Sequence, residues 1–124
     1  MKLLIAGSRD FNDYSYLNER ISRIQDNNVI NFIISGKAQG ADTLGARFAL
    51  EHSIPVKEYP ADWNLYGKSA GMIRNKLMAE EADRAVIFWD GKSKGTKNMI
   101  DLMKRLHKPC TVYFYNEQDE FEDF

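Results

Sequence analysis

Five short apolar runs are spread along the chain, and each has the length of a β-strand. They cover residues 2–6, 29–34, 56–59, 85–89 and 111–115. Most of them lack a strict alternation of apolar and polar positions, which is typical of strands that are covered on both faces. The pattern therefore predicts a sheet buried between two layers.

The segments between these runs carry apolar residues at helical spacing, after the capping candidates Asn12 and Asp13 in the first case. The four sets are Tyr14, Leu17, Ile21 and Ile24; Ala41, Leu44, Phe48 and Ala49; Ala70, Ile73, Leu77 and Ala82; and Met99, Ile100, Met103 and Leu106. The last helix is expected to start near Thr96 and to end before Pro109.

Strands and helices thus alternate, and parallel neighbouring strands need crossover helices between them. We expect one Rossmann-like α/β domain over residues 1–115, with three layers and helices on both faces of the sheet. The five strands should form a mostly parallel sheet in the order 3-2-1-4-5, because crossovers are right-handed.

Composition is ordinary for a soluble globular protein, with 44% hydrophobic and 28% charged residues. No apolar run is long enough for a signal peptide or a membrane span. The single cysteine, Cys110, suits a reducing compartment and is expected to be a small core residue. A cytoplasmic protein is the resulting expectation.

Charge is distributed unevenly. Residues 116–124 hold five acids and no base, which leaves 17 bases against 13 acids, or +4, for residues 1–115. A mildly basic body suits an anionic small molecule and is weak evidence for a DNA-binding surface. We expect the acidic tail to be a solvated, frayed end; the alternative is that it contacts the basic edge and competes with a ligand.

Four loops that follow predicted strands are rich in Gly, Ser and basic residues. They are residues 7–11, 35–42, 60–71 and 90–96, and the loops that return from helix to strand show no such enrichment. All four loops fall at the carboxyl edge of the predicted sheet, where open α/β sheets bind ligands. Glycine permits close backbone approach, and free N–H groups at a helix start suit phosphate.

This edge gives a set of candidate ligand-binding residues. They are Gly7, Ser8, Arg9, Ser35, Gly36, Gly40, Ala41, Asp42, Trp63, Arg74, Asn75, Asp90, Gly91, Ser93, Gly95 and Thr96. Lys37, Lys92 and Lys94 could add charge. Asp42 and Asp90 are the acids best placed as a general base or as partners of ribose hydroxyls, and either could equally be a helix cap.

Three aromatic residues near the third loop allow two interpretations. Tyr59, Trp63 and Tyr66 could stack on a base, or they could cover the loop or form a homodimer surface. Tyr16 could also serve such a dimer interface.

Several common site types are absent from the sequence. Gly67-Lys68-Ser69 and Gly91-Lys92-Ser93 resemble the end of a P-loop, but Asp62 and Val86 stand where its first glycine is needed. No G-x-G-x-x-G follows the first strand. His52 and His107 have no partners at metal-ligand spacing, so neither a metal nor a cofactor is expected.

Five ordered motifs carry a family resemblance over about residues 1–115. They are Gly7-Ser8-Arg9, Ser35-Gly36-x-Ala38-x-Gly40-Ala41-Asp42, Pro60-x-Asp62-Trp63, Gly71-x-x-Arg74-Asn75 and Asp90-Gly91-x-Ser93-x-Gly95-Thr96. Together they resemble the YspA-like branch of the SLOG (Smf/DprA–Lonely guy) superfamily. The resemblance implies a Rossmann-like fold, nucleotide-related ligands and a bacterial or phage source.

The Lonely guy phosphoribohydrolases of this superfamily carry R-K-x-x-M and P-G-G-x-G-T-x-x-E motifs. Residues 74–78 are similar to the first motif, whereas aligning Gly95-Thr96 on the second places Met99 on its catalytic glutamate. Cleaving an N-glycosidic bond needs an acid or a base near the leaving group, and Met99 cannot serve. The resemblance therefore supports binding more than hydrolysis.

The sequence and the family resemblance together leave three candidate functions. The first is binding of a nucleotide-derived small molecule, ADP-ribose-like or a nucleoside monophosphate, by a sensor or a sequestering protein. The alternative is a nucleotide N-glycosidic hydrolase. The second alternative, by analogy of fold with Smf/DprA, is binding of single-stranded nucleic acid.

Overall fold

The computed structural model describes residues 1–36, 39–116 and 120–124. Within these residues one sheet has the strand order β3-β2-β1-β4-β5-β6. The strands are β1 Lys2–Gly7, β2 Phe32–Ser35, β3 Val56–Glu58, β4 Arg84–Trp89, β5 Cys110–Phe114 and β6 Phe121–Asp123. Neighbouring strands among the first five pair in parallel, and β6 pairs antiparallel with β5. The predicted order 3-2-1-4-5 is confirmed, and a sixth strand extends it.

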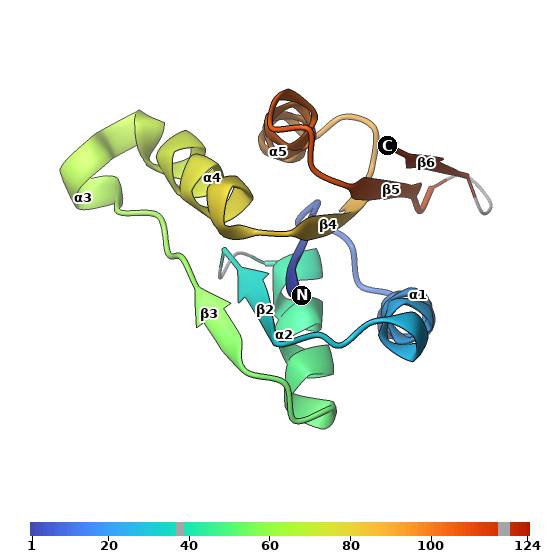
Figure 1. The fold of residues 1–124 in the computed structure, drawn as a ribbon. Coiled ribbons are helices and arrows are strands. Elements are labelled where there is room, and N and C mark those ends of the chain that lie inside the picture. The colour runs from blue at the N-terminus through green and yellow to red at the C-terminus, as the bar shows by residue number, and fades with distance from the viewer. Residues whose placement is uncertain (37–38, 117–119) are drawn as a thin grey trace.

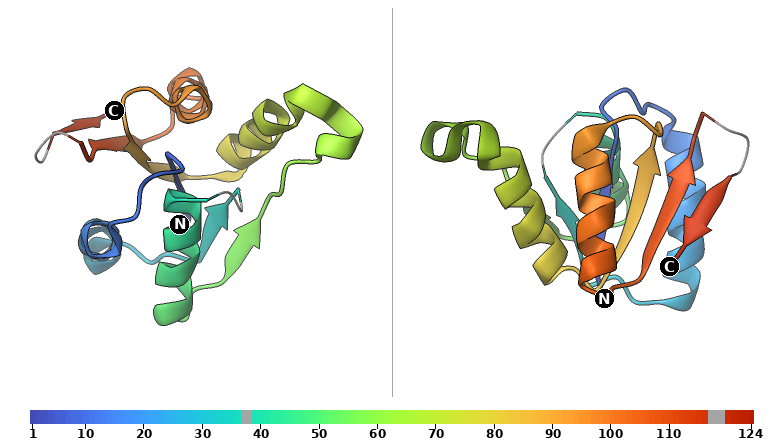
Figure 2. Two further views of the ribbon diagram at one scale, coloured as in Figure 1. Left: turned by 180° about the vertical axis from the view of Figure 1, so that it is seen from behind. Right: turned by 90° about the horizontal axis from the view of Figure 1, so that it is seen from above.

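Helices cover both faces of this sheet (Figure 1). α1 Tyr14–Asn27 and α2 Ala41–Glu51 lie on one face, and α4 Ala70–Glu81 and α5 Lys94–Arg105 lie on the other. The short helix α3 Trp63–Tyr66 and the 3-10 turn η1 Gly67–Ser69 precede α4 and project from the body of the molecule (Figure 2). The four predicted helices are confirmed, and α3 with η1 is an addition.

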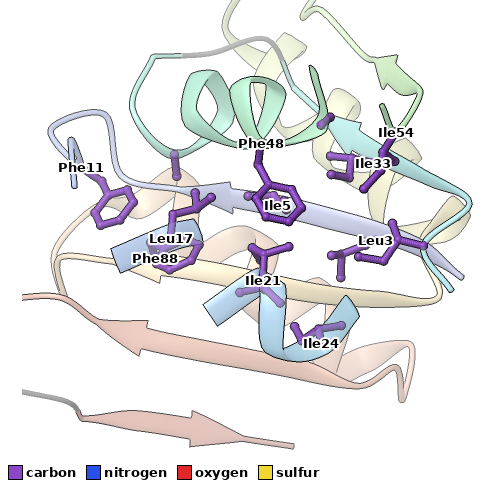
Figure 3. Close-up of a cluster of buried hydrophobic side chains, with 14 residues drawn as sticks. Leu3, Ile5, Phe11, Leu17, Ile21, Ile24, Ile33, Phe48, Ile54 and Phe88 are labelled. Carbon is purple, nitrogen blue, oxygen red and sulfur yellow. The ribbon is translucent and has the colours of Figure 1, made fainter. Parts of the chain in front are cut away.

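Two hydrophobic cores lie on opposite faces of the sheet because alternate strand residues point in opposite directions. In β1, Leu3 and Ile5 join the core beneath α1 and α2, while Leu4 joins the core beneath α4 and α5. Figure 3 shows the first core, in which Phe48 of α2 lies over Ile5. Burial on both faces explains why the strands lack an alternating pattern.

Close packing of α2 on the sheet requires small residues. A Cβ added at Gly45 would lie 2.9 Å from Cγ2 of Ile5, and one added at Gly7 would lie 2.7 Å from Cβ of Ala41. The start of α2 is therefore held against the end of β1, where the candidate loops begin.

The apolar face predicted for α4 is wrong in part. Leu77 is 51% exposed, whereas Met78 and Ala79 are buried against the sheet. The apolar spacing in α4 is ambiguous because Ile73 and Leu77 form a second stripe beside the buried one.

The acidic tail is also more ordered than expected. Residues 121–123 form β6, in which Phe121 pairs with Tyr113 and Asp123 pairs with Thr111. The open edge of β5 supplies backbone donors and acceptors for this strand, which needs no buried side chains of its own. Residues 117–119 of the tail lie outside the described part of the chain.

Candidate functional site

Two adjoining pockets lie at the carboxyl ends of the central strands. The α5 pocket is lined by Ala6, Gly7, Arg9, Asp42, Arg74, Asn75, Met78, Ser93, Gly95, Thr96 and Met99. The Trp63 pocket is lined by Arg9, Gly36, Gln39, Pro60, Ala61, Trp63 and Arg74. Their cavity volumes are about 120 and 360 Å³. Small-molecule sites usually have about 300–1,000 Å³, so the α5 pocket alone is too small for a nucleotide, which would have to extend over both pockets.

Arg9 and Arg74 are shared by both pockets, so they stand at the boundary between them. Arg74 donates from Nη1 to the backbone oxygen of Gly36 at 2.6 Å and from Nε to Oδ1 of Asn75 at 3.1 Å. Burial lowers the pKa of the Arg74 guanidinium, Asp42 raises it and Arg9 lowers it again. Three charged residues, from the loop after β1, from α2 and from α4, thus interact at this boundary.

Gly36 makes room for two of these charged groups. A Cβ added there would lie 2.7 Å from Nη1 of Arg74 and 2.9 Å from Oδ2 of Asp42. The Asp42 carboxylate, on the first turn of α2, is 6% exposed. The glycine therefore allows an arginine and a carboxylate to meet where the two pockets join.

The first turn of α5 forms the opposite wall of the α5 pocket. Ser93 is the N-cap of this helix, and its side chain makes no capping hydrogen bond. A Cβ added at Gly95 would meet nothing within 4 Å, and the hydroxyl of Thr96 donates to Oγ of Ser93 at 3.2 Å. Because the N–H groups of a first helical turn carry partial positive charge, this wall suits an anionic group.

Asp90 shapes the loop that leads into α5. Its Oδ1 accepts hydrogen bonds from the backbone N–H groups of Lys92 and Ser93, both at 2.8 Å. Burial raises the pKa of Asp90, but the hydrogen bonds from Ser93, Lys92 and Ser8 outweigh it, so the net pKa is lowered. Asp90 lines neither pocket, and its contacts are those of a turn-forming carboxylate.

Ten of the sixteen candidate residues line a pocket, and six do not. Those six are Ser8, Ser35, Gly40, Ala41, Asp90 and Gly91. Buried Ser8 accepts from the backbone N–H of Asp90 at 3.1 Å, and Gly40 has a positive φ of 77° beside the Ser8 backbone. These residues hold neighbouring loops together. Lys37 lies outside the described residues.

Asn75 is the one buried polar residue of α4 that lines the α5 pocket. Its Nδ2 donates to the backbone oxygen of Gly95 at 3.2 Å and to Oδ1 of Asn98 at 3.1 Å. Asn75 thereby positions the start of α5 relative to Arg74.

The floor of the α5 pocket includes two methionines, Met78 and Met99, both buried. Met99, which the sequence comparison leads us to expect at the position of the hydrolases' glutamate, lines this pocket and supplies no carboxylate. Besides Met99, five lining residues are not among the candidates from the sequence, namely Ala6, Gln39, Pro60, Ala61 and Met78. All but Met78 lie within or beside the Gly-rich loops, which is the signal that could have found them.

The aromatic candidates separate in the structure. Trp63 is 56% exposed and lines the Trp63 pocket. Tyr59 and Tyr66 line a different hollow, beside Ile73 and Leu77. Tyr16 is partly buried, and the Arg20 guanidinium lies 3.5 Å from its ring centroid. Of these four residues, Trp63 is the one that lines a pocket at the carboxyl edge.

Comparison with protein families gives a match to the model of the YspA, cpYpsA-related SLOG family over residues 1–66, from β1 to α3. That is more than half of the chain. The chain belongs to this family. Membership of the SLOG family points to binding or processing of a nucleotide-related molecule.

A more distant similarity extends further along the chain. The gene 61 protein of Mycobacterium phage D29 is 28% identical over 106 residues, which cover 80% of this chain and 85% of that protein. No solved structure matches the chain. The family match ends before α4, so Arg74, Asn75 and the Asp90–Thr96 loop rest on the geometry described above.

Two further observations concern the described residues. They contain no group of three His, Cys, Asp or Glu side chains able to hold a metal ion. Among them there is also no helix with the length and apolar character needed to cross a membrane.

Proposed function

We propose that this protein binds a nucleotide-derived small molecule across the α5 pocket and the Trp63 pocket. The ligand is a nucleoside monophosphate or an ADP-ribose-like molecule, and the protein acts as a sensor or a sequestering protein. The observation that carries this proposal is the pair Arg9 and Arg74 at the boundary of two pockets, facing the first turn of α5.

The chemistry of the walls supports this assignment. Arginine side chains and helix N-termini are the groups that proteins use for phosphate. The exposed ring of Trp63, with Pro60 and Ala61, gives an apolar surface on which a base can stack. A phosphate at α5 and a base at Trp63 would place both ends of a nucleotide on suitable partners.

Binding is favoured over hydrolysis by the content of the α5 pocket. Met99 lies where the phosphoribohydrolases keep a glutamate, and Asp90 is committed to the turn before α5. Incubation with AMP, NAD and ADP-ribose should therefore release no free base. Release of adenine or nicotinamide above the rate without protein would favour the hydrolase instead.

The direct test is calorimetric titration with AMP, ADP-ribose and NAD, together with mass spectrometry of small molecules that remain bound through purification. We expect Arg74→Ala to weaken nucleotide binding about tenfold to a hundredfold, because it removes charge-assisted hydrogen bonds. Lys76→Ala is the matched control, since Lys76 is an exposed base on the same helix that lines neither pocket.

The proposal fails if no nucleotide co-purifies and none of the three binds. It also fails if the two variants bind equally well. Binding of oligonucleotides with a steep dependence on salt, in place of mononucleotides, would favour the single-stranded nucleic-acid alternative.

A further inference from the structure

The α5 pocket contains a carboxylate in a place where phosphate alone would not need one. Among the described residues that line either pocket, Asp42 is the single acid. It is buried, and its charge raises the pKa of the Arg74 guanidinium against the larger lowering caused by burial. A carboxylate repels phosphate, so a neutral group that donates hydrogen bonds is its natural partner in a ligand.

The position of Asp42 indicates which part of a nucleotide it would meet. Its Oδ2 lies 2.9 Å from the point that a Gly36 Cβ would occupy, and Gly36 lines the Trp63 pocket. Asp42 itself lines the α5 pocket. The carboxylate therefore stands between the helix terminus that suits phosphate and the ring that suits a base.

The middle part of a nucleotide is the ribose. We infer that Asp42 accepts hydrogen bonds from the ribose hydroxyls, so that the site selects ribonucleotides over deoxyribonucleotides. This inference rests on the proposed function. A carboxylate accepts hydrogen bonds and donates none, which suits hydroxyl donors such as those of a ribose.

Asp90 is the other acid that the sequence predicts for binding ribose hydroxyls, and its position in the structure excludes it from this role. Its Oδ1 is engaged by two backbone N–H groups, and the residue lines neither pocket. The ribose assignment thus falls on Asp42 because, in the part of the chain that the structure describes, it is the acid that lies between the two subsites.

The first experiment uses the unaltered protein and compares AMP with 2′-deoxyAMP and 3′-deoxyAMP by calorimetry. Loss of a hydrogen bond to a charged acceptor should weaken binding of one or both deoxynucleotides about tenfold to a hundredfold. IMP, which lacks the exocyclic amine of adenine, should bind like AMP. Equal binding of AMP and both deoxynucleotides overturns this inference and leaves the proposed function standing.

The second experiment tests whether the preference for ribose depends on Asp42. In Asp42→Asn the preference for AMP over the deoxynucleotides should fall to within about threefold, because the charged acceptor is gone. Asp26→Asn is the control, an exposed acid on α1 that should keep the full preference. A merely structural Asp42 would lower the affinity for all three nucleotides equally and keep their ratio.

Three other results would overturn the inference. One is an undiminished preference for ribose in Asp42→Asn. Another is discrimination of AMP from IMP that disappears in this variant, which would assign Asp42 to the base. Failure of all the nucleotides to bind the unaltered protein would overturn the proposed function as well, so the two failures can be told apart.

Discussion

Two glycines at the ends of neighbouring strands differ in what a methyl group would meet. At Gly36 the added Cβ would lie 2.7 Å from Nη1 of Arg74 and 2.9 Å from Oδ2 of Asp42, which are the ends of side chains that can move. We expect Gly36→Ala to fold with a free energy of unfolding within about 1 kcal/mol of the unaltered protein. Its affinity for AMP should fall about tenfold, because both charged groups are displaced from the pocket boundary.

Gly7→Ala is the informative contrast. Here the Cβ would meet the backbone oxygen of Phe88 and lie 2.7 Å from Cβ of Ala41, in a region held by two strands and a helix. Overpacking of this kind costs about 1–3 kcal/mol, so this variant should unfold at lower urea concentration. Urea unfolding and AMP titration of both variants test the pair, and a Gly36→Ala protein that binds AMP normally would contradict the assignment of the boundary.

At the same scale, the sequence identified the residues of the site better than their roles. The enrichment of Gly, Ser and basic residues at one edge pointed to Arg9, Arg74 and the start of α5, and the pockets include them. It could not separate Asp42 from Asp90, because both lie in glycine-containing loops at the carboxyl edge. In the structure Asp42 lines the α5 pocket, whereas Asp90 accepts from two backbone N–H groups and lines neither pocket.

At the scale of elements, the loop between β4 and α5 depends on the carboxylate of Asp90. Replacing it with alanine removes an acceptor for two backbone N–H groups, which typically costs about 1 kcal/mol. Asp90→Ala should therefore lower the free energy of unfolding at neutral pH. Because Asn keeps one acceptor oxygen, Asp90→Asn should lose less.

The effect of Asp90 should also depend on pH in a definite direction. Burial raises its pKa, while the stronger sum of hydrogen bonds lowers it below the ordinary aspartate value near 3.8. The carboxylate thus contributes stability at pH values above that ordinary value, and the contribution is lost as pH falls through the lowered pKa. The difference in unfolding free energy between the unaltered protein and Asp90→Asn should shrink between about pH 4 and pH 2. A difference that stays constant over this range would show that the charge plays no part.

Elements with a strong apolar pattern were predictable, and elements without one were not. β1 and β4 are buried on both faces and appear as continuous apolar runs, and α1 starts at the capping residue Asp13 as expected. β6 escaped prediction because its three residues are exposed and it forms through backbone pairing with β5. α3 is four residues long and buries none of them, so no periodicity could reveal it.

At the scale of the whole molecule, the open question is what the acidic tail does for the fold. The sequence predicts a tail that is separate from a domain of residues 1–115. In the structure this tail contributes β6 to the sheet. Cys110 and Phe124 exchange two backbone hydrogen bonds at 2.8 and 3.0 Å, and the Thr111 hydroxyl is bonded to Asp123. We propose that residues 1–115 remain a folding unit, because the two cores contain none of the tail residues that the structure describes.

Truncation after Tyr115 tests this proposal, and the single cysteine provides the readout. Cys110 is 1% exposed, and burial raises the pKa of its thiol to about 12, so alkylation of the intact protein should be slow at neutral pH. Removing residues 116–124 should accelerate alkylation, because Phe124 and Asp123 line the hollow beside Cys110. Unfolding should remain cooperative with a loss of about 1–3 kcal/mol, since only a few cross-strand pairs are removed. A truncated protein without a cooperative transition would show that β6 belongs to the folding unit, whereas unchanged alkylation would show that it does not shield the thiol.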